Sequence, residues 1–66
     1  MTRKRVGGFI LITYRGDHPP IHVHIEKDQR EIGRWDIENQ KPMDSFEVSR
    51  KLRAALEKEG YLITGE

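Results

Sequence analysis

Three histidines, the only ones in the chain, fall within the seven residues from His18 to His24. The last two, His22 and His24, alternate with the apolar residues Val23 and Ile25. Successive side chains of an extended strand point to opposite faces, so this spacing predicts that both imidazoles share one face. Imidazole is the commonest metal ligand in proteins and titrates near neutral pH. The pair therefore predicts either a metal site or acid–base chemistry.

A metal site is the first of these possibilities. Two histidines at this spacing place their Cα atoms roughly 6.5 to 7 Å apart, close enough to hold one ion. His18, Glu26 or Asp17 could complete three ligands, and zinc would suit such a set. The chain has no cysteine, so imidazole and carboxylate are the only strong ligands that it offers.

Acid–base catalysis is the second possibility, and it needs no cofactor. Two imidazoles can cleave a phosphodiester when one takes the proton of a ribose hydroxyl and the other gives a proton to the leaving oxygen. In this interpretation His22 and His24 are the catalytic pair, and His18 assists them. The phosphate would be held by arginines from the surrounding loops and strands, namely Arg15, Arg30 and Arg34.

A purely structural interpretation competes with both chemical ones. The histidines can form the polar face of an antiparallel strand, with Asp36 and Tyr14 as cross-strand partners. The basic run Arg3, Lys4 and Arg5 likewise has two interpretations, a phosphate-binding arm or a solubilising end. Three histidines within seven residues, next to a proline pair, favour a functional role.

The elements that must position the histidines are three strands and a helix. Residues 8–14 are rich in β-branched and aromatic side chains, which predicts a first strand. Residues 21–26 form the second strand, and residues 31–37 form the third after a hairpin loop over residues 27–30. Gly33 inside the third strand indicates a bulge or a close backbone approach, with a large neighbour such as Trp35 or Tyr14 covering the gap.

A helix is predicted after these strands from a capping pattern and an apolar stripe. Asp44 is expected to cap it, with Glu47 at the third helical position. The stripe of one helical face is made of Val48, Leu52, Ala55 and Leu56. Gly60 is placed to end the helix, after which Leu62 and Ile63 either seal the core or add a short strand.

These elements predict an α+β fold in which a three-stranded antiparallel sheet packs one face on a C-terminal helix, in the order βββα. Residues 1–7 are expected to be a flexible basic N-terminus, residues 8–63 a single α+β domain, and residues 64–66 a frayed C-terminus.

The composition limits the size of the core and the kinds of partner that we expect. The chain has 66 residues, of which 35% are hydrophobic and 35% charged, so we expect a thin core and an exposed sheet face. An unpaired sheet edge could bind a small cognate protein or a second copy in a homodimer.

The longest apolar run, residues 9–12, is far shorter than the roughly 20 residues of a membrane helix. No signal-peptide core follows the basic start, so we expect a cytoplasmic protein without membrane contact.

The surroundings of the histidines resemble a known family. Residues 17–24 have the pattern Asp-His-x-Pro-x-His-x-His, preceded by Phe9-Ile10-Leu11-Ile12 and followed by a hairpin, a strand with Trp35 and a charged helix. In these features the chain resembles, over about residues 8–60, the small bacterial family called domain of unknown function 4160. The resemblance implies a compact α+β domain of unassigned activity. Genes of this family often lie beside that of a second small protein in toxin–antitoxin-like pairs.

The resemblance implies RNA or a small partner protein as the target, with His18, His22 and His24 as the shared site. We therefore expect a bacterial, RNA-directed component of a toxin–antitoxin-like pair. The alternatives are a non-catalytic interaction module and a zinc site on the same three histidines. Whether the protein is an enzyme stays open at this point.

Overall fold

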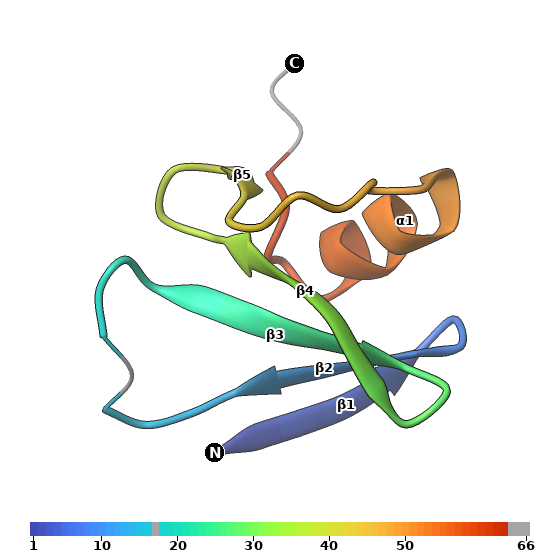
Figure 1. Ribbon diagram of the computed structural model, residues 1–66, viewed down its shortest axis with the longest axis horizontal. Coiled ribbons are helices and arrows are strands. Elements are labelled where there is room, and N and C mark those ends of the chain that lie inside the picture. The colour runs from blue at the N-terminus through green and yellow to red at the C-terminus, as the bar shows by residue number, and fades with distance from the viewer. Residues whose placement is uncertain (17, 64–66) are drawn as a thin grey trace.

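The strands follow one another in the sheet in the order in which they occur in the chain. The computed structural model describes residues 1–16 and 18–63, so Asp17 and the expected frayed end lie outside the described residues. The antiparallel sheet contains β1 (Thr2–Val6), β2 (Phe9–Thr13), β3 (His22–Lys27), β4 (Arg30–Asp36) and β5 (Lys41–Pro42). Helix α1 (Arg50–Lys58) lies to one side of the sheet, and the segment after β5 leads to it past β4 (Figure 1).

The predicted class, an antiparallel sheet with one C-terminal helix, is confirmed, but the sheet has five strands and not three. Residues 2–6, which we expected in a flexible N-terminus, form β1 and pair with β2 from Thr2↔Thr13 to Val6↔Phe9. The fifth strand, β5, has only two residues and pairs with the end of β4. The histidine strand β3 therefore lies in the centre of the sheet, with two strands on each side.

Two tight turns set the pairing registers of β1 with β2 and of β3 with β4. Gly7 and Gly8 join β1 to β2 with φ values of 56° and 86°, and this left-handed conformation is readily adopted by glycine. Asp28 and Gln29 join β3 to β4 with φ values of 54° and 67°. A two-residue loop with positive φ at both positions matches the twist of the strands that it joins. The hairpin predicted over residues 27–30 is therefore present, with Lys27 paired to Arg30.

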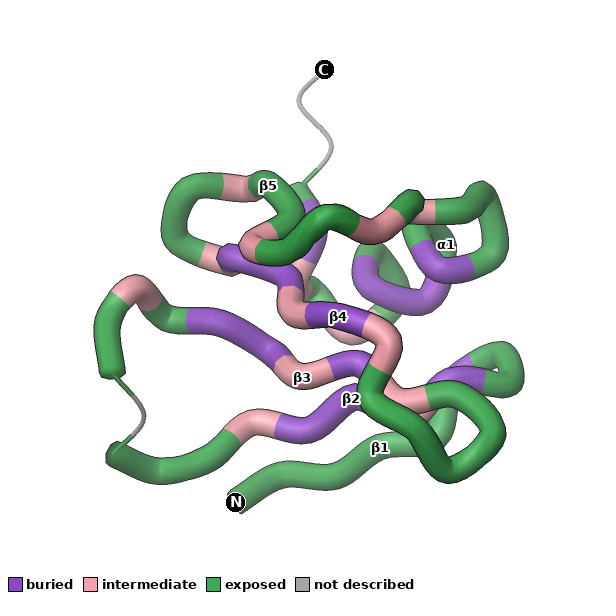
Figure 2. The backbone as a smooth tube through the Cα atoms, viewed as in Figure 1, coloured by how far each residue is buried: buried purple, intermediate pink, exposed green. Residues whose placement is uncertain are grey.

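The core lies between the sheet and α1. From the sheet it contains Val6, Phe9, Leu11, Val23, Ile25 and Trp35. The helix contributes Leu52, Ala55 and Leu56, which the helical spacing predicted. Full burial of one large aliphatic side chain contributes about 1.5–3 kcal/mol. Figure 2 shows the buried stretches along β2, β3, β4 and α1, whereas β1 is exposed along most of its length.

The helix begins later than predicted. Ser49 is the N-cap, and its hydroxyl accepts a hydrogen bond of 3.2 Å from the backbone N–H of Leu52. The predicted capping box, with Asp44 as the cap and Glu47 at the third helical position, is wrong. Asp44 binds an arginine side chain of β4 instead, and Val48 packs against the core just before the helix.

The predicted end of the helix is confirmed at Gly60, which has a φ of 80°. The backbone N–H of Tyr61 donates to the oxygen of Leu56 at 2.8 Å, and that of Gly60 donates to the oxygen of Glu57 at 3.0 Å. These two bonds are a Schellman motif, which supplies hydrogen-bond donors to carbonyls in the last turn that have no partner within the helix. Leu62 is buried and seals the core.

A bulge in β4 sets which residues face the histidines. The pairing register shifts between Ile25 and Glu26 of β3, and Ile32 is the extra residue on β4. Gly33 follows it, and the ring of Phe46 lies so close to Gly33 that any Cβ would overlap it. The bulge and the close approach expected at Gly33 are both present, but the aromatic side chain that covers it is Phe46 and not Trp35 or Tyr14.

Candidate functional site

The two central imidazoles lie side by side on the sheet face away from α1. The ring centroids of His22 and His24 are 5.0 Å apart, and the rings are tilted by 57°. Val23 and Ile25 are fully buried on the opposite, helix-covered face. The prediction that both imidazoles share one face is confirmed. Ile21, which the alternation grouped with Val23 and Ile25, instead precedes β3 and is 66% exposed.

We call the sheet face away from the helix the histidine face, and define it by Ile12, His22, His24 and Arg34. Register places Ile12 beside His24 on β2 and Arg34 beside His24 on β4. His22 is only 7% exposed, so this face is partly covered by its own side chains. The histidines are therefore held in place and not simply solvated.

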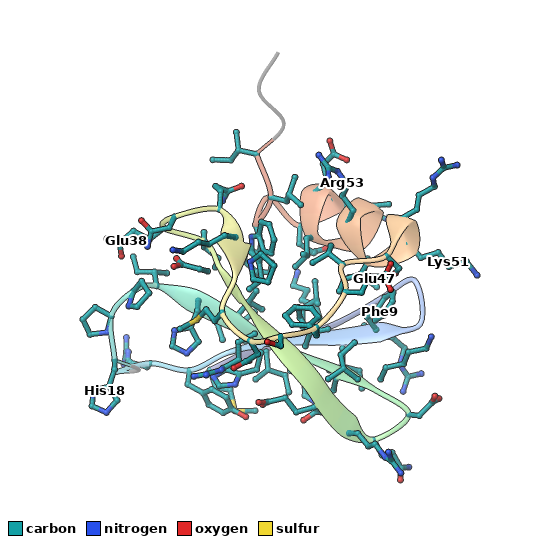
Figure 3. The ribbon with its side chains drawn as sticks, turned by 45° about the horizontal axis from the view of Figure 1, so that its top comes forward. Phe9, His18, Glu38, Glu47, Lys51 and Arg53 are labelled. Carbon is teal, nitrogen blue, oxygen red and sulfur yellow. The ribbon has the colours of Figure 1, made fainter. Side chains whose placement is uncertain are left out.

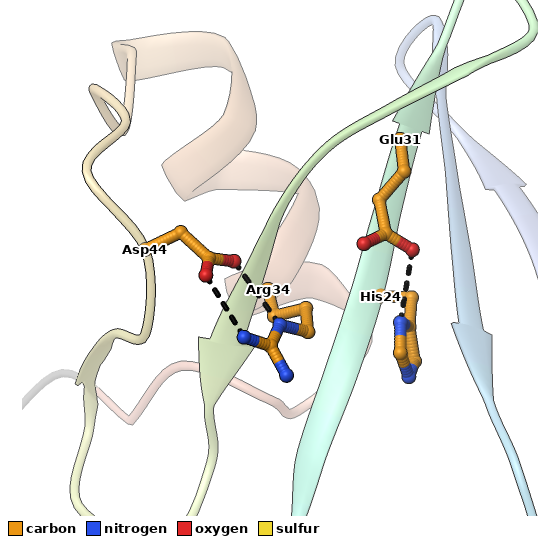
Figure 4. Close-up of polar contacts among 4 residues, drawn as sticks. All are labelled: His24, Glu31, Arg34 and Asp44. Carbon is orange, nitrogen blue, oxygen red and sulfur yellow. Dashed lines mark hydrogen bonds and ion pairs between the residues drawn. The ribbon is translucent and has the colours of Figure 1, made fainter.

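Each imidazole donates its Nδ1 proton to a nearby oxygen. In His22 the acceptor is the carbonyl oxygen of Pro20 at 2.7 Å, and in His24 it is the carboxylate of Glu31 at 3.0 Å (Figure 4). Both oxygens only accept hydrogen bonds, so they place a proton on Nδ1 of each ring.

An arginine is fixed next to this pair. The guanidinium of Arg34 binds the carboxylate of Asp44 through two hydrogen bonds of 2.9 and 3.1 Å (Figure 4). The hydrogen bond from Arg34 and its charge hold the pKa of the Asp44 carboxyl below its ordinary value, although partial burial opposes this shift. A two-point contact of this kind fixes the guanidinium plane, so Arg34 is positioned beside His24.

The structural partners expected of the histidines are found in part. The ring of Tyr14 meets that of His24 edge to face, with centroids 4.9 Å apart. Asp36 is opposite His22 in the register, but its carboxylate accepts two hydrogen bonds of 2.8 Å from Asn39. Burial would raise the pKa of Asp36, but the hydrogen bonds from Asn39, the charge of Lys41 and the backbone of Glu38 together lower this pKa.

The remaining predicted site residues lie at different distances from the pair. His18 is exposed in the loop between β2 and β3, where Figure 3 shows it directed away from the sheet. Arg15 is exposed in the same loop. Arg30 pairs with Lys27, which lies five residues beyond His22 along β3. The Cα atom of Arg30 is therefore about 17 Å from that of His22 along the strand direction. The structure thus brings His22 and Arg34 into one site and leaves Arg30 at the opposite end of the strand.

A hollow opens beside His22 at the end of the sheet where β3 begins. Its volume is about 370 Å³, and it is lined by Thr13, Tyr14, Gly16, His18, Pro19, Ile21 and His22. His18 and His22 therefore border the same space, although they come from a loop and a strand. Nowhere in residues 1–16 and 18–63 do three His, Asp or Glu side chains gather in a way that could hold a metal ion.

Sequence reasoning missed Glu31 and Asp44, and it did not place Arg3 beside the histidine face. Glu31 and Asp44 hold His24 and Arg34, and their roles depend on contacts between different strands and loops. Arg3 lies opposite Ile12, so Arg3, Ile12 and His24 form one row across the sheet. Two neighbouring glycines at a predicted strand end are a hairpin signal, and they could have placed Arg3 on this face.

Comparison with known proteins finds no matching family model, no matching curated protein and no matching solved structure. In the described part of the chain, no helix is long and apolar enough to cross a membrane.

Proposed function

We propose that this chain is a small cytoplasmic, RNA-directed protein of a toxin–antitoxin-like pair, and that it cleaves RNA with His22 and His24. The observation that supports this most is the imidazole pair itself, with ring centroids 5.0 Å apart and an oxygen acceptor on Nδ1 of each ring. Such acceptors place a proton on Nδ1 of each ring, and the proposed proton transfers use Nε2. The resemblance to domain of unknown function 4160 supports the same proposal.

The proposed reaction is a transfer of the phosphoryl group within the RNA strand. Nε2 of one imidazole removes the proton from a ribose 2′-hydroxyl, and the 2′-oxygen attacks the neighbouring phosphorus. The bond from phosphorus to the 5′-oxygen breaks, and this oxygen takes a proton from Nε2 of the other imidazole. The products are a 2′,3′-cyclic phosphate and a 5′-hydroxyl end.

Arg34 of the histidine face and Arg3 of β1 would hold the phosphate. The backbone of Arg34 lies one strand from that of His24, about 5 Å away. The backbone of Arg3 lies two strands from that of His24 on the other side, about 10 Å away. A fixed guanidinium stabilises the negative charge that develops on the phosphate oxygens. The contact of Arg34 with Asp44 sets its orientation before RNA binds.

The test is cleavage of end-labelled single-stranded RNA in the presence of a chelator. We expect cleavage to persist without divalent ions and to produce 2′,3′-cyclic phosphate ends. His22→Asn and His24→Asn keep an N–H donor near the position of Nδ1 but remove Nε2, so each should abolish cleavage without unfolding the protein. Cleavage that survives in both variants, or that requires a divalent ion, would refute the proposal.

Arg34→Ala and Arg30→Ala form a matched pair on the same strand. Both remove one positive charge, but only Arg34 lies beside His24. We expect Arg34→Ala to lower kcat/KM by about 10- to 1,000-fold, in the range of lost transition-state donors, and Arg30→Ala to leave it nearly unchanged. Equal losses in the two variants would mean that only net charge matters.

The alternative, a module that pairs its sheet edge with a partner protein or with a second copy, has less support. The edge strand β1 carries Arg3, Lys4 and Arg5, and charged residues of this kind oppose pairing between edges. The other edge, β5, has two residues and ends in Pro42, which lacks a backbone donor. Light scattering would reveal a stable dimer if edge pairing occurs.

A further inference from the structure

We infer that the hollow beside His22 binds one unpaired base of the RNA, so that the substrate is single-stranded. This inference rests on the proposed RNA cleavage. It concerns a space that the phosphate chemistry does not use, since the hollow lies toward the loop between β2 and β3 and not over Arg34.

The first support is the apolar surface around the hollow. In the described part of the chain, four large apolar side chains are exposed, and two of these, Tyr14 at 45% and Ile21 at 66%, line the hollow. An exposed aromatic ring and an exposed branched aliphatic side chain that line one hollow form the apolar wall that is typical of ligand pockets. Pro19 adds a third apolar surface. A flat ring that stacks on these groups would cover them.

The second support is size and position. A volume of about 370 Å³ is at the lower end of the range for small-molecule sites, which suits one base with its ribose. His22 forms part of the wall, so a base in the hollow would bring its own ribose and phosphate to the imidazole pair. Thr13 and His18 supply polar groups that can bind the edge of a base. A base held in a duplex cannot enter, because its faces are stacked and its edge is paired.

The test compares adenosine 5′-monophosphate with ribose 5-phosphate, which has the same phosphate and sugar but no base. We expect the nucleotide to bind about 5- to 100-fold more tightly by calorimetry, as stacking of one base on protein side chains predicts. Ile21→Ser should remove about 3- to 10-fold of this advantage and leave ribose 5-phosphate binding unchanged. Ile63→Ser is the matched control, because Ile63 is 70% exposed but does not line the hollow.

The same variants are then compared in cleavage. Cleavage of a single-stranded RNA should be faster than cleavage of the same sequence in a duplex, and Ile21→Ser should reduce that ratio while cleavage itself continues. Equal affinities for adenosine 5′-monophosphate and ribose 5-phosphate, or equal effects of Ile21→Ser and Ile63→Ser, would overturn the base site. Neither result would contradict the proposed imidazole chemistry. Failure of both phosphates to bind, together with an absence of cleavage, would overturn the proposed function and this inference with it.

Discussion

The contact between Gly33 and Phe46 gives the sharpest test of how the sheet is built. Gly33 is buried in β4, and the nearest atoms to a Cβ built on it all belong to the ring of Phe46. Its φ is not in the left-handed region, so its backbone conformation does not require glycine. The residue is therefore glycine because the ring needs the space.

The size of the effect follows from two opposing contributions. Alanine inside a strand is better than glycine by about 0.5–1 kcal/mol, because glycine loses more conformational freedom on folding. Overpacking of a filled site costs about 1–3 kcal/mol. Gly33→Ala should therefore lower the free energy of unfolding by about 0.5–2 kcal/mol in the natural chain. In a Phe46→Ala background the ring is gone, and the same substitution should raise that free energy by about 0.5–1 kcal/mol.

The assay is urea unfolding of the four proteins of this double-mutant cycle, followed by the fluorescence of Trp35, which is buried against the core. The expected result is a change of sign in the effect of Gly33→Ala between the two backgrounds. A loss of the same size in both backgrounds would refute the reasoning, because the glycine would then serve the bulge and not the ring. The contact also bears on the site, since Phe46 anchors the segment that presents Asp44 to Arg34.

Three further substitutions test the helix, the core and the ion pair. Ser49→Ala should cost about 1 kcal/mol of unfolding free energy by urea titration, whereas Ser45→Ala, outside the cap, should have little effect. Leu56→Ala should cost about 2–5 kcal/mol, enough for circular dichroism to show substantial unfolding of so small a domain. The pKa of Asp44 is lowered in the folded state, so its contribution to stability is present above the unfolded pKa and is lost as the pH falls through the folded pKa. Asp44→Asn should flatten this acid dependence of the urea midpoint, and an unchanged acid limb would show that Arg34 does not stabilise the carboxylate.

Local patterns predicted the parts of the fold that depend on neighbours in sequence. The apolar spacing of α1 and its end at Gly60 follow from the geometry of one helix. The start of the helix was misplaced because both Asp44 and Ser49 can cap a helix. In the structure Asp44 binds Arg34 of β4, and Ser49 accepts the hydrogen bond from the N–H of Leu52.

The first strand was missed because β1 has no apolar alternation. Its residues Thr2 to Arg5 are all exposed, so their pattern resembles a solvated terminus. What makes them a strand is the turn at Gly7 and Gly8, which folds them back along β2. The informative signal was therefore the glycine pair and not the residues of the strand, and it also determines that Arg3 shares a face with His24.

The composition of the histidine face shows where sequence reasoning stops. Alternation alone places His22 and His24 together, and it needs no knowledge of other strands. The neighbour of His24 on β4 depends on the bulge, because the hairpin register of Lys27↔Arg30, continued without an extra residue, would pair His24 with Gly33. The extra residue shifts the register by one, so that Arg34 takes that place. A one-residue shift also exchanges the two faces of the strand, which would otherwise turn Arg34 toward the helix. The phosphate-binding part of the proposed site therefore depends on one inserted residue, whereas the imidazole pair would exist without it.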